Sequence, residues 1–347
     1  MSASASARVS TRAAVGFAIG HPGISLPDCV ELAVQGDAGG LHMVGAGDGF
    51  IESFSVLGAI AARTSRIRVI STVATWTRTP VTTAVGAAAL DELSGGRFAL
   101  GLGTMPKEWS EGWHDVSYER PVERMRDFIA CIRECWAATP GAPVERDGPC
   151  YRVHGYAPLG VRPARPIPIY LGTTRRRMTE LAGEIADGVC INHLNSVSWL
   201  RERALPALDA GVARAGRSRS AIDVGLAVYC AIAGSEAAAF ELIRPTLAFY
   251  FPVPYFADLL RQLGYDDELA RGRAALAAGD TAGAIGCITD EIVDPIAVAG
   301  TAAQASEKLR RYDGLVDWIE LMAPLGHPPA VTRGQIEAQI ATFGHRA

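Results

Sequence analysis

The feature that most constrains this chain is a regular alternation of short apolar runs with helical patterns. Apolar runs of strand length recur eight times, and each is followed by a stretch whose apolar residues have the spacing of an amphipathic helix. We predict strands at 15–19, 41–45, 67–73, 98–102, 167–171, 188–191, 224–229 and 315–321. Eight strand–helix units describe a (β/α)8 TIM barrel, of the α/β class. A doubly wound sheet would explain the first half, but it rarely needs eight units.

The length of 347 residues suits one barrel that carries insertions. We predict a disordered N-terminus over residues 1–12, rich in Ser, Ala and Arg, and a single barrel domain over 13–347. Two segments interrupt the alternation. Residues 139–166 are rich in Pro and Gly and are expected to form a surface hairpin, and residues 251–294 carry helical patterns of their own.

Composition and charge exclude several classes of function. A formal charge of −4 argues against a nucleic-acid binder, which needs clustered Lys and Arg. The seven cysteines are scattered without a Cys-x-x-Cys pair, which is typical of a reducing cytoplasm. The sequence shows no apolar signal-peptide core and no apolar run of membrane-spanning length. We therefore expect a cytoplasmic protein with a small-molecule substrate and neither nucleic acid nor membrane as a partner.

The chemistry of a barrel enzyme lies in the loops that follow the carboxyl ends of its strands. Four acid–base side chains fall in these loops and are candidate catalytic proton donors: His21, Asp48, His114 and His193. A lone histidine is more often a packed or surface residue, so a structural role stays open for each. The seven histidines show no HExxH motif and no second ligand at helical spacing, so we predict no metal site.

The loop after the fifth strand opens a helix with the sequence Gly172-Thr173-Thr174-Arg175-Arg176-Arg177. Free N–H groups at a helix start, two hydroxyls and clustered guanidinium groups together favour an anion such as a phosphate. The same residues also fit a helix start with solvated arginines. Spacing alone does not decide between these two interpretations.

Two local motifs bear on helix boundaries. Gly101-x-Gly103-x-x-Pro106 resembles a dinucleotide fingerprint only in part, because Pro replaces the third glycine and we predict no helix before about Pro121. Near the C-terminus, Thr332-x-x-Gln335 has the pattern of a capping box and is expected to open the closing helix.

Several stretches resemble the luciferase-like monooxygenase superfamily. Residues 90–103 (LDELSGGRFALGLG) resemble its signature, and residues 181–188 (LAGEIADG) resemble its second recurring stretch. Residues 61–68 and 78–80 fit as well, and the order and spacing agree over residues 15–345. Some members of the superfamily bind FMN and activate oxygen. Others bind the deazaflavin coenzyme F420 and transfer a hydride, as methylenetetrahydromethanopterin reductase does.

Residues 103–104, 111–114, 118–121, 263–265 and 291–294 resemble the deazaflavin branch. The resemblance implies an oxidoreductase that transfers a hydride between coenzyme F420 and an organic substrate at the C-terminal face of the barrel, in a protein that we expect to be a homodimer. Two alternatives stay open. One is an FMN-dependent monooxygenase, and the other is a cofactor-free barrel enzyme or a small-molecule binding protein.

The resemblance also implies where the cofactor ring would bind. Thr72 and Val73 stand at the end of the third strand, where the family has a non-prolyl cis peptide behind the central ring of the deazaflavin. Gly103 and Thr104 would approach the polar ring or the ribityl chain. The histidine that is common after the second strand is replaced by Gly49, so a proton donor must come from elsewhere or is not needed.

The phosphate region shows a departure from the family. The resemblance assigns it to Gly172, Thr173 and Thr174. The family usually has a Gly-Pro pair where this chain has Arg175 and Arg176. We therefore expect these two guanidinium groups to replace backbone amides as phosphate ligands.

Overall fold

The computed structural model describes residues 12–49 and 51–344, so the N-terminus predicted to be disordered lies outside this part except for Arg12. A closed sheet of eight parallel strands forms the centre, and β12 completes the ring by pairing with both β10 and β1. In order these strands are β1 (Ala14–Ala18), β2 (Met43–Ala46), β3 (Arg68–Ser71), β5 (Phe98–Gly103), β8 (Ile169–Thr173), β9 (Gly188–Ile191), β10 (Asp223–Ile232) and β12 (Trp318–Met322). The predicted (β/α)8 barrel is confirmed.

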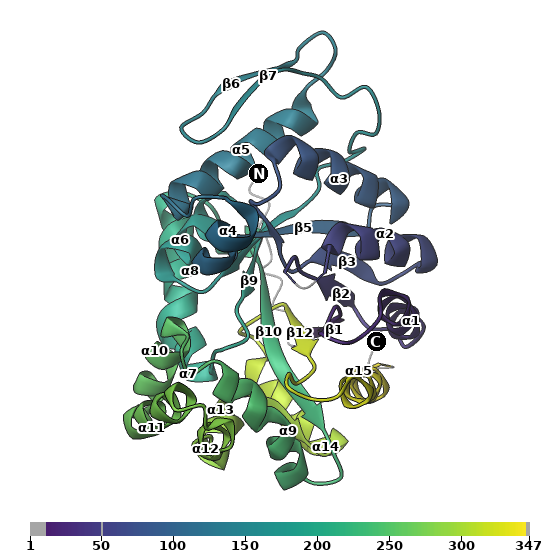
Figure 1. Cartoon of the computed structure of the whole chain (residues 1–347). Coiled ribbons are helices and arrows are strands. Elements are labelled where there is room, and N and C mark those ends of the chain that lie inside the picture. Colours follow the sequence, from purple (N-terminus) through teal and green to yellow (C-terminus); the bar gives the residue numbers. More distant parts are fainter. Residues whose placement is uncertain (1–11, 50, 345–347) are drawn as a thin grey trace, which may run out of the picture.

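The main helices surround the barrel (Figure 1). They are α1 (Leu26–Ala38), α2 (Ser53–Arg63), α3 (Pro80–Leu93), α5 (Pro121–Ala137), α6 (Arg176–Ile185), α8 (Leu205–Arg214), α9 (Glu236–Phe249), α14 (Ala302–Leu309) and α15 (Pro329–Phe343). Shorter elements are β4 (Ala74–Thr75), α4 (Lys107–His114), α7 (Val197–Trp199), the π-helix η1 (Leu200–Ala204), η2 (Arg219–Ala221), β11 (Val298–Gly300) and η3 (Arg310–Tyr312). Apolar helix faces pack on the strands in one large core.

The two interrupting segments fold on opposite sides of the barrel. The first contains the antiparallel pair β6 (Val144–Asp147) and β7 (Arg152–Tyr156), the expected surface hairpin, at the top of Figure 1. The second contains α10 (Pro254–Leu263), α11 (Asp266–Ala277), α12 (Thr281–Gly286) and α13 (Asp290–Ile296). These four helices share a second apolar core with α9 and lie at the lower left of Figure 1.

Two predictions about helix boundaries are wrong. A helix does begin before Pro121, because α4 starts directly after Pro106. The closing helix starts at Pro329 rather than at Thr332, and Gln335 does not cap it. The Gln335 side chain instead accepts a hydrogen bond from the Ile232 N–H (2.8 Å) and donates one to the Ile232 carbonyl (3.0 Å). A pattern in the sequence cannot show that tertiary partner.

Glycines at the C-terminal end of the barrel make room for residues 72 and 73. A Cβ at Gly103 would overlap Val73 Cγ2, and a Cβ at Gly172 would lie 2.8 Å from Val73 Cγ1. A Cβ at Gly47 would lie 2.7 Å from the Thr72 carbonyl oxygen. The peptide bond between Thr72 and Val73 is cis, as the family resemblance implies. The Val73 side chain thus fills the space beside Gly103 and Gly172.

We expect Gly103→Ala to lower the free energy of unfolding by about 1–3 kcal/mol, because the new methyl group overpacks against Val73. The same change in a Val73→Ala background should cost clearly less, and denaturant unfolding of the four proteins in this cycle measures the coupling. Gly112→Ala is the matched control, since nothing lies within 4 Å of a Cβ there. Strictly additive costs of the Gly103 and Val73 substitutions would contradict the packing argument.

Candidate active site

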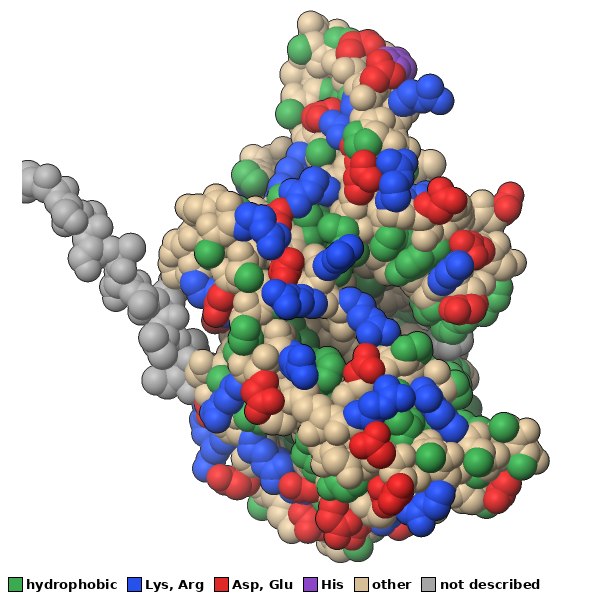
Figure 2. Space-filling model, turned by 90° about the vertical axis from the view of Figure 1, so that its left-hand side faces the viewer, with side chains coloured by type: hydrophobic (Ala, Val, Ile, Leu, Met, Phe, Trp, Pro, Cys, Tyr) green, Lys and Arg blue, Asp and Glu red, His purple; other side chains and the backbone are tan. Residues whose placement is uncertain are grey.

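A cavity of about 410 Å³ opens at the C-terminal face of the barrel, beside the loop after β8. Its walls come from that loop, from the residues that follow β9, from η1 and the start of α8, and from α10. The lining residues that matter for its chemistry are Thr173, Thr174, Arg175, Arg176, Asn192, Asn195, Trp199, Glu202, Arg203 and Tyr255. Figure 2 shows this side of the molecule, which is hollowed near its middle and has several basic side chains around the hollow.

The cavity is rich in hydrogen-bond donors suited to an anion. Four consecutive residues predicted to hold a phosphate, Thr173 to Arg176, line it together. Arg175 Nη1 lies 2.9 Å from Asp258 Oδ2, and Arg176 Nε lies 2.7 Å from Glu180 Oε1, yet these arginine side chains are 55% and 81% exposed. Exposed ion pairs of this kind contribute little to stability, so both guanidinium groups can turn to a ligand.

One side-chain oxygen beside the same cavity, that of Asn195, lacks a hydrogen-bond donor. Asn195 is 1% exposed, and its Nδ2 donates to the Asn192 carbonyl at 2.6 Å. Its Oδ1 is buried and has no hydrogen-bond partner. A buried acceptor without a partner carries a desolvation penalty of about 1–3 kcal/mol. For a ligand, the cavity mainly offers the hydroxyl and guanidinium donors of Thr173 to Arg176.

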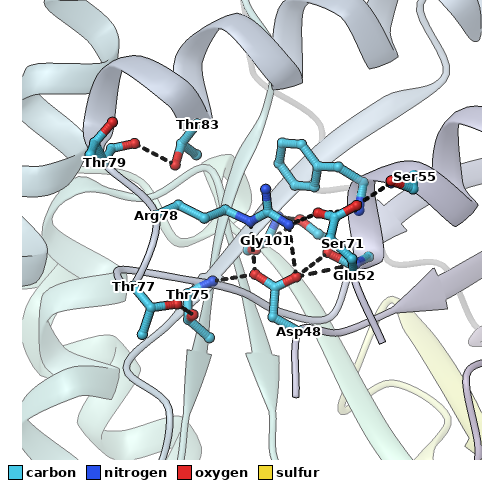
Figure 3. A network of polar contacts seen from close by, with 12 residues as sticks. Asp48, Glu52, Ser55, Ser71, Thr75, Thr77, Arg78, Thr79, Thr83 and Gly101 are labelled. Atoms are coloured by element: carbon cyan, nitrogen blue, oxygen red, sulfur yellow. Dashed lines mark hydrogen bonds and ion pairs between the residues drawn. The ribbon is translucent and has the colours of Figure 1, made fainter. Parts of the chain in front are cut away.

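Asp48 is fully engaged in a polar network, seen in Figure 3. Arg78 donates from Nε to Oδ2 (2.9 Å) and from Nη2 to Oδ1 (3.1 Å) and also pairs with Glu52. The Ser53 hydroxyl (2.6 Å) and the Thr75 N–H (3.1 Å) donate to the same carboxylate. Burial alone would raise the pKa of Asp48, but the hydrogen bonds from Arg78 and Ser53 outweigh burial and hold the pKa below its usual value. Asp48 is thus ionised at neutral pH and joins the loops after β2 and β3.

The histidine candidates differ from one another. His21 is 5% exposed, and its Nε2 has no partner. Burial lowers the pKa of His21 to about 4 and that of His193 to about 4, so both imidazoles are neutral at pH 7. His114 ends α4 and is exposed. No hydrogen bond or ion pair within residues 12–49 and 51–344 joins any two of the four candidate donors.

His193 belongs to a chain of polar groups that the sequence does not reveal. Its Nε2 lies 3.1 Å from the Tyr250 hydroxyl, which lies 2.9 Å from the Tyr229 hydroxyl. The three residues come from the loop after β9, from the residue that follows α9, and from β10. The neutral imidazole and the two hydroxyl groups carry one polar hydrogen each. Their two mutual hydrogen bonds use two of these, so one N–H or O–H remains to donate elsewhere.

Thr104 lies at the end of β5 and is half-buried, and the Tyr118 hydroxyl donates to its Oγ1 at 3.1 Å. Sequence reasoning missed Arg203 of the cavity, which has no sequence signal because it lies in η1 rather than in a loop directly after a strand. It also missed Glu320, whose only sequence signal is a carboxylate inside an apolar strand.

Within the described part of the chain, no group of three or more His, Cys, Asp or Glu side chains is arranged so that it could hold a metal ion. None of the helices in that part has the length and apolar character that crossing a membrane requires.

Comparison with known proteins agrees with this architecture. The chain is 30% identical to a putative coenzyme F420-dependent oxidoreductase of Mycobacterium tuberculosis over 316 residues, covering 82% of this chain and 88% of that protein. It is 32% identical to 5,10-methylenetetrahydromethanopterin reductase of Archaeoglobus fulgidus over 234 residues, covering 66% of this chain and 68% of the reductase.

Among solved structures, the coenzyme F420-dependent tetrahydromethanopterin reductase of Methanopyrus kandleri has the same fold. The TM-score is 0.80 at 24% identity, over 95% of this chain and all (100%) of the reductase. The family model for luciferase-like monooxygenases matches residues 7–317. With eight parallel strands in a closed barrel and this match, the chain belongs to the luciferase-like monooxygenase family.

Proposed function

We propose that this protein is an oxidoreductase that transfers a hydride between coenzyme F420 and an organic substrate bound at the C-terminal face of the barrel. The observation that carries the proposal is the cationic, hydroxyl-rich cavity at the end of β8, in a chain whose relatives include proteins named as F420-dependent. When bound, the deazaflavin supplies the hydride from its central ring.

The residues present fit such a cofactor. Thr173, Thr174, Arg175 and Arg176 would hold the phosphate with hydroxyl and charge-assisted hydrogen bonds. Thr72 and Val73, at the floor of the barrel mouth, would support the ring. Tyr255 of α10 lines the cavity, so α10 forms part of one wall of the site.

Hydride transfer to a substrate C=N or C=O group leaves negative charge on the heteroatom, which then needs a proton. Asp48 does not supply it, because its carboxylate is ionised and tied to Arg78. We assign this role to the hydrogen-bonded chain of His193, Tyr250 and Tyr229, which would pass on a proton taken from water, because the neutral imidazole is not itself an acid at pH 7. His21 is buried with an unpartnered Nε2, and His114 is exposed at the end of α4.

Titration of the purified protein with coenzyme F420 and with FMN tests the cofactor. We expect F420 to bind with a change in its fluorescence and FMN to bind more weakly. Binding of FMN without F420 would instead establish the FMN-dependent alternative. If neither binds, the protein is a cofactor-free barrel enzyme or a small-molecule binding protein.

Removing either arginine of the cavity should weaken cofactor binding. We expect Arg175→Ala or Arg176→Ala to raise the F420 dissociation constant about tenfold, since a charge-assisted hydrogen bond contributes about 1.5–3 kcal/mol and 1.4 kcal/mol is one decade. Arg177→Ala is the matched control, because Arg177 is exposed and does not line the cavity. Added salt should weaken binding to the parent more than to the variants. Equal affinity of all four proteins would make these arginines a solvated helix start.

Asp48→Asn should destabilise the fold. We expect a loss of about 1–3 kcal/mol at pH 7, because Arg78 loses a charged acceptor. A carboxylate whose pKa is lower in the folded protein stabilises the fold at pH values above its unfolded pKa. This contribution to the free energy of unfolding is lost as the pH falls through the folded pKa. The difference from the parent should therefore shrink in acid, as urea unfolding from pH 7 to pH 3 would show. Exposed Glu119→Gln is the control, and a constant difference at every pH would argue against an ionised Asp48.

A further inference from the structure

A buried carboxylate lies inside the barrel, below its C-terminal mouth. Glu320 is in the middle of β12 and is 5% exposed. The neighbouring strands place Gly16 of β1 and Ala227 of β10 opposite it in register. A Cβ at Gly45 of β2 would overlap Glu320 Oε1. Gly45 thus leaves space that this side chain occupies, whereas Met43 fills the space beside Gly16.

Glu320 is connected directly to the floor of the proposed cofactor site. Thr72 Oγ1 donates a hydrogen bond to Glu320 Oε1 at 2.8 Å. Thr72 and Val73, which follow β3, are both half-buried, so part of their surface stays exposed. A molecule whose ring rests on residues 72 and 73 would thus lie one hydrogen-bonded residue away from the carboxyl group.

We propose that Glu320 is a proton-binding positioning residue beneath the cofactor site, and that it takes up a proton when the anionic cofactor binds. The inference rests on the proposed function in that it places the cofactor at the mouth. An ionised carboxylate under a phosphorylated ligand repels it through a medium of low dielectric constant. Binding therefore favours the neutral carboxylic acid, and one proton moves from water to Glu320 Oε1 or Oε2.

The surroundings of Glu320 leave this group free to change its charge. Burial raises the pKa of Glu320 to about 7, and the hydrogen bond from Thr72 opposes this effect. Cys190 of β9 feels the charge of Glu320, and burial, followed by that charge, raises the pKa of the thiol well above its usual value. The other groups that act on Cys190 are Asp223 and Arg68, at the N-terminal end of the barrel. Small changes in potential at the mouth therefore shift the protonation of Glu320 near pH 7.

Infrared titration of the cofactor-free protein tests the protonation itself. We expect the C=O band of a carboxylic acid to be present at pH 5.5, to disappear with a midpoint near pH 7, and to be absent from Glu320→Gln. Thr72→Val should move the midpoint to higher pH, because it removes the hydrogen bond that lowers the pKa. No such band in the parent, or an unshifted midpoint in Thr72→Val, would overturn the proposal.

Binding of coenzyme F420 as a function of pH tests the coupling. If binding raises the pKa of Glu320 by about one unit, the dissociation constant of the parent should increase about fivefold from pH 6 to pH 8 beyond the change seen in Glu320→Gln. The ionising groups of the ligand act equally in both proteins, so the difference isolates Glu320. Calorimetry in buffers of different ionisation enthalpy should show greater proton uptake by the parent at pH 7.5 than by Glu320→Gln.

The outcomes separate this inference from the proposed function. If F420 binds neither protein at any pH, the proposed function fails, while the infrared result still stands. If F420 binds both with the same pH dependence and proton uptake, the proposed function survives and Glu320 is a structural residue only. Exposed Glu92→Gln, which should behave as the parent in every measurement, is the control for the loss of one carboxylate.

Discussion

The pairing of β12 with β1 closes the sheet, and the arrangement of the site depends on it. In this register Gly16 lies opposite Glu320 and Phe17 opposite Leu321. Closure removes the open edges that a parallel sheet would otherwise expose. It also places Glu320 within hydrogen-bond distance of Thr72, a residue 248 positions away in the chain. In an open doubly wound sheet, the first and last strands would not meet in this way.

The two ends of the barrel are filled differently. At the N-terminal end, Tyr170 and Trp318 pack edge to face, and Arg68 donates to the Tyr170 hydroxyl at 2.9 Å. At the C-terminal end, glycines leave space that Val73 and Glu320 use. Large side chains close one end, and small ones leave the other able to take a ligand. This asymmetry explains why the open end can accept a titratable carboxyl group, which a tightly packed apolar layer would exclude.

Local sequence patterns predicted the parts of the site that are contiguous. Thr173, Thr174, Arg175 and Arg176 line one cavity because they follow one strand and open one helix. The sequence also predicted Asp48 as a proton donor, but it did not reveal the partner Arg78. That arginine comes from another loop and holds the carboxylate ionised. Acid–base behaviour depends on such partners and on burial, neither of which the residue type or its spacing reveals.

By itself, the sequence determined the barrel, most of its helices and the loops that face the site, because hydrophobic periodicity and capping residues act over a few residues. Only the tertiary structure decided that Gln335 binds the backbone of β10 instead of capping a helix, and that Gly103 accommodates Val73. It also decided that His193 shares a hydrogen-bonded chain with Tyr250 and Tyr229. These contacts join residues that are distant in the chain, and closure of the sheet brings such residues together at distances that no local pattern encodes.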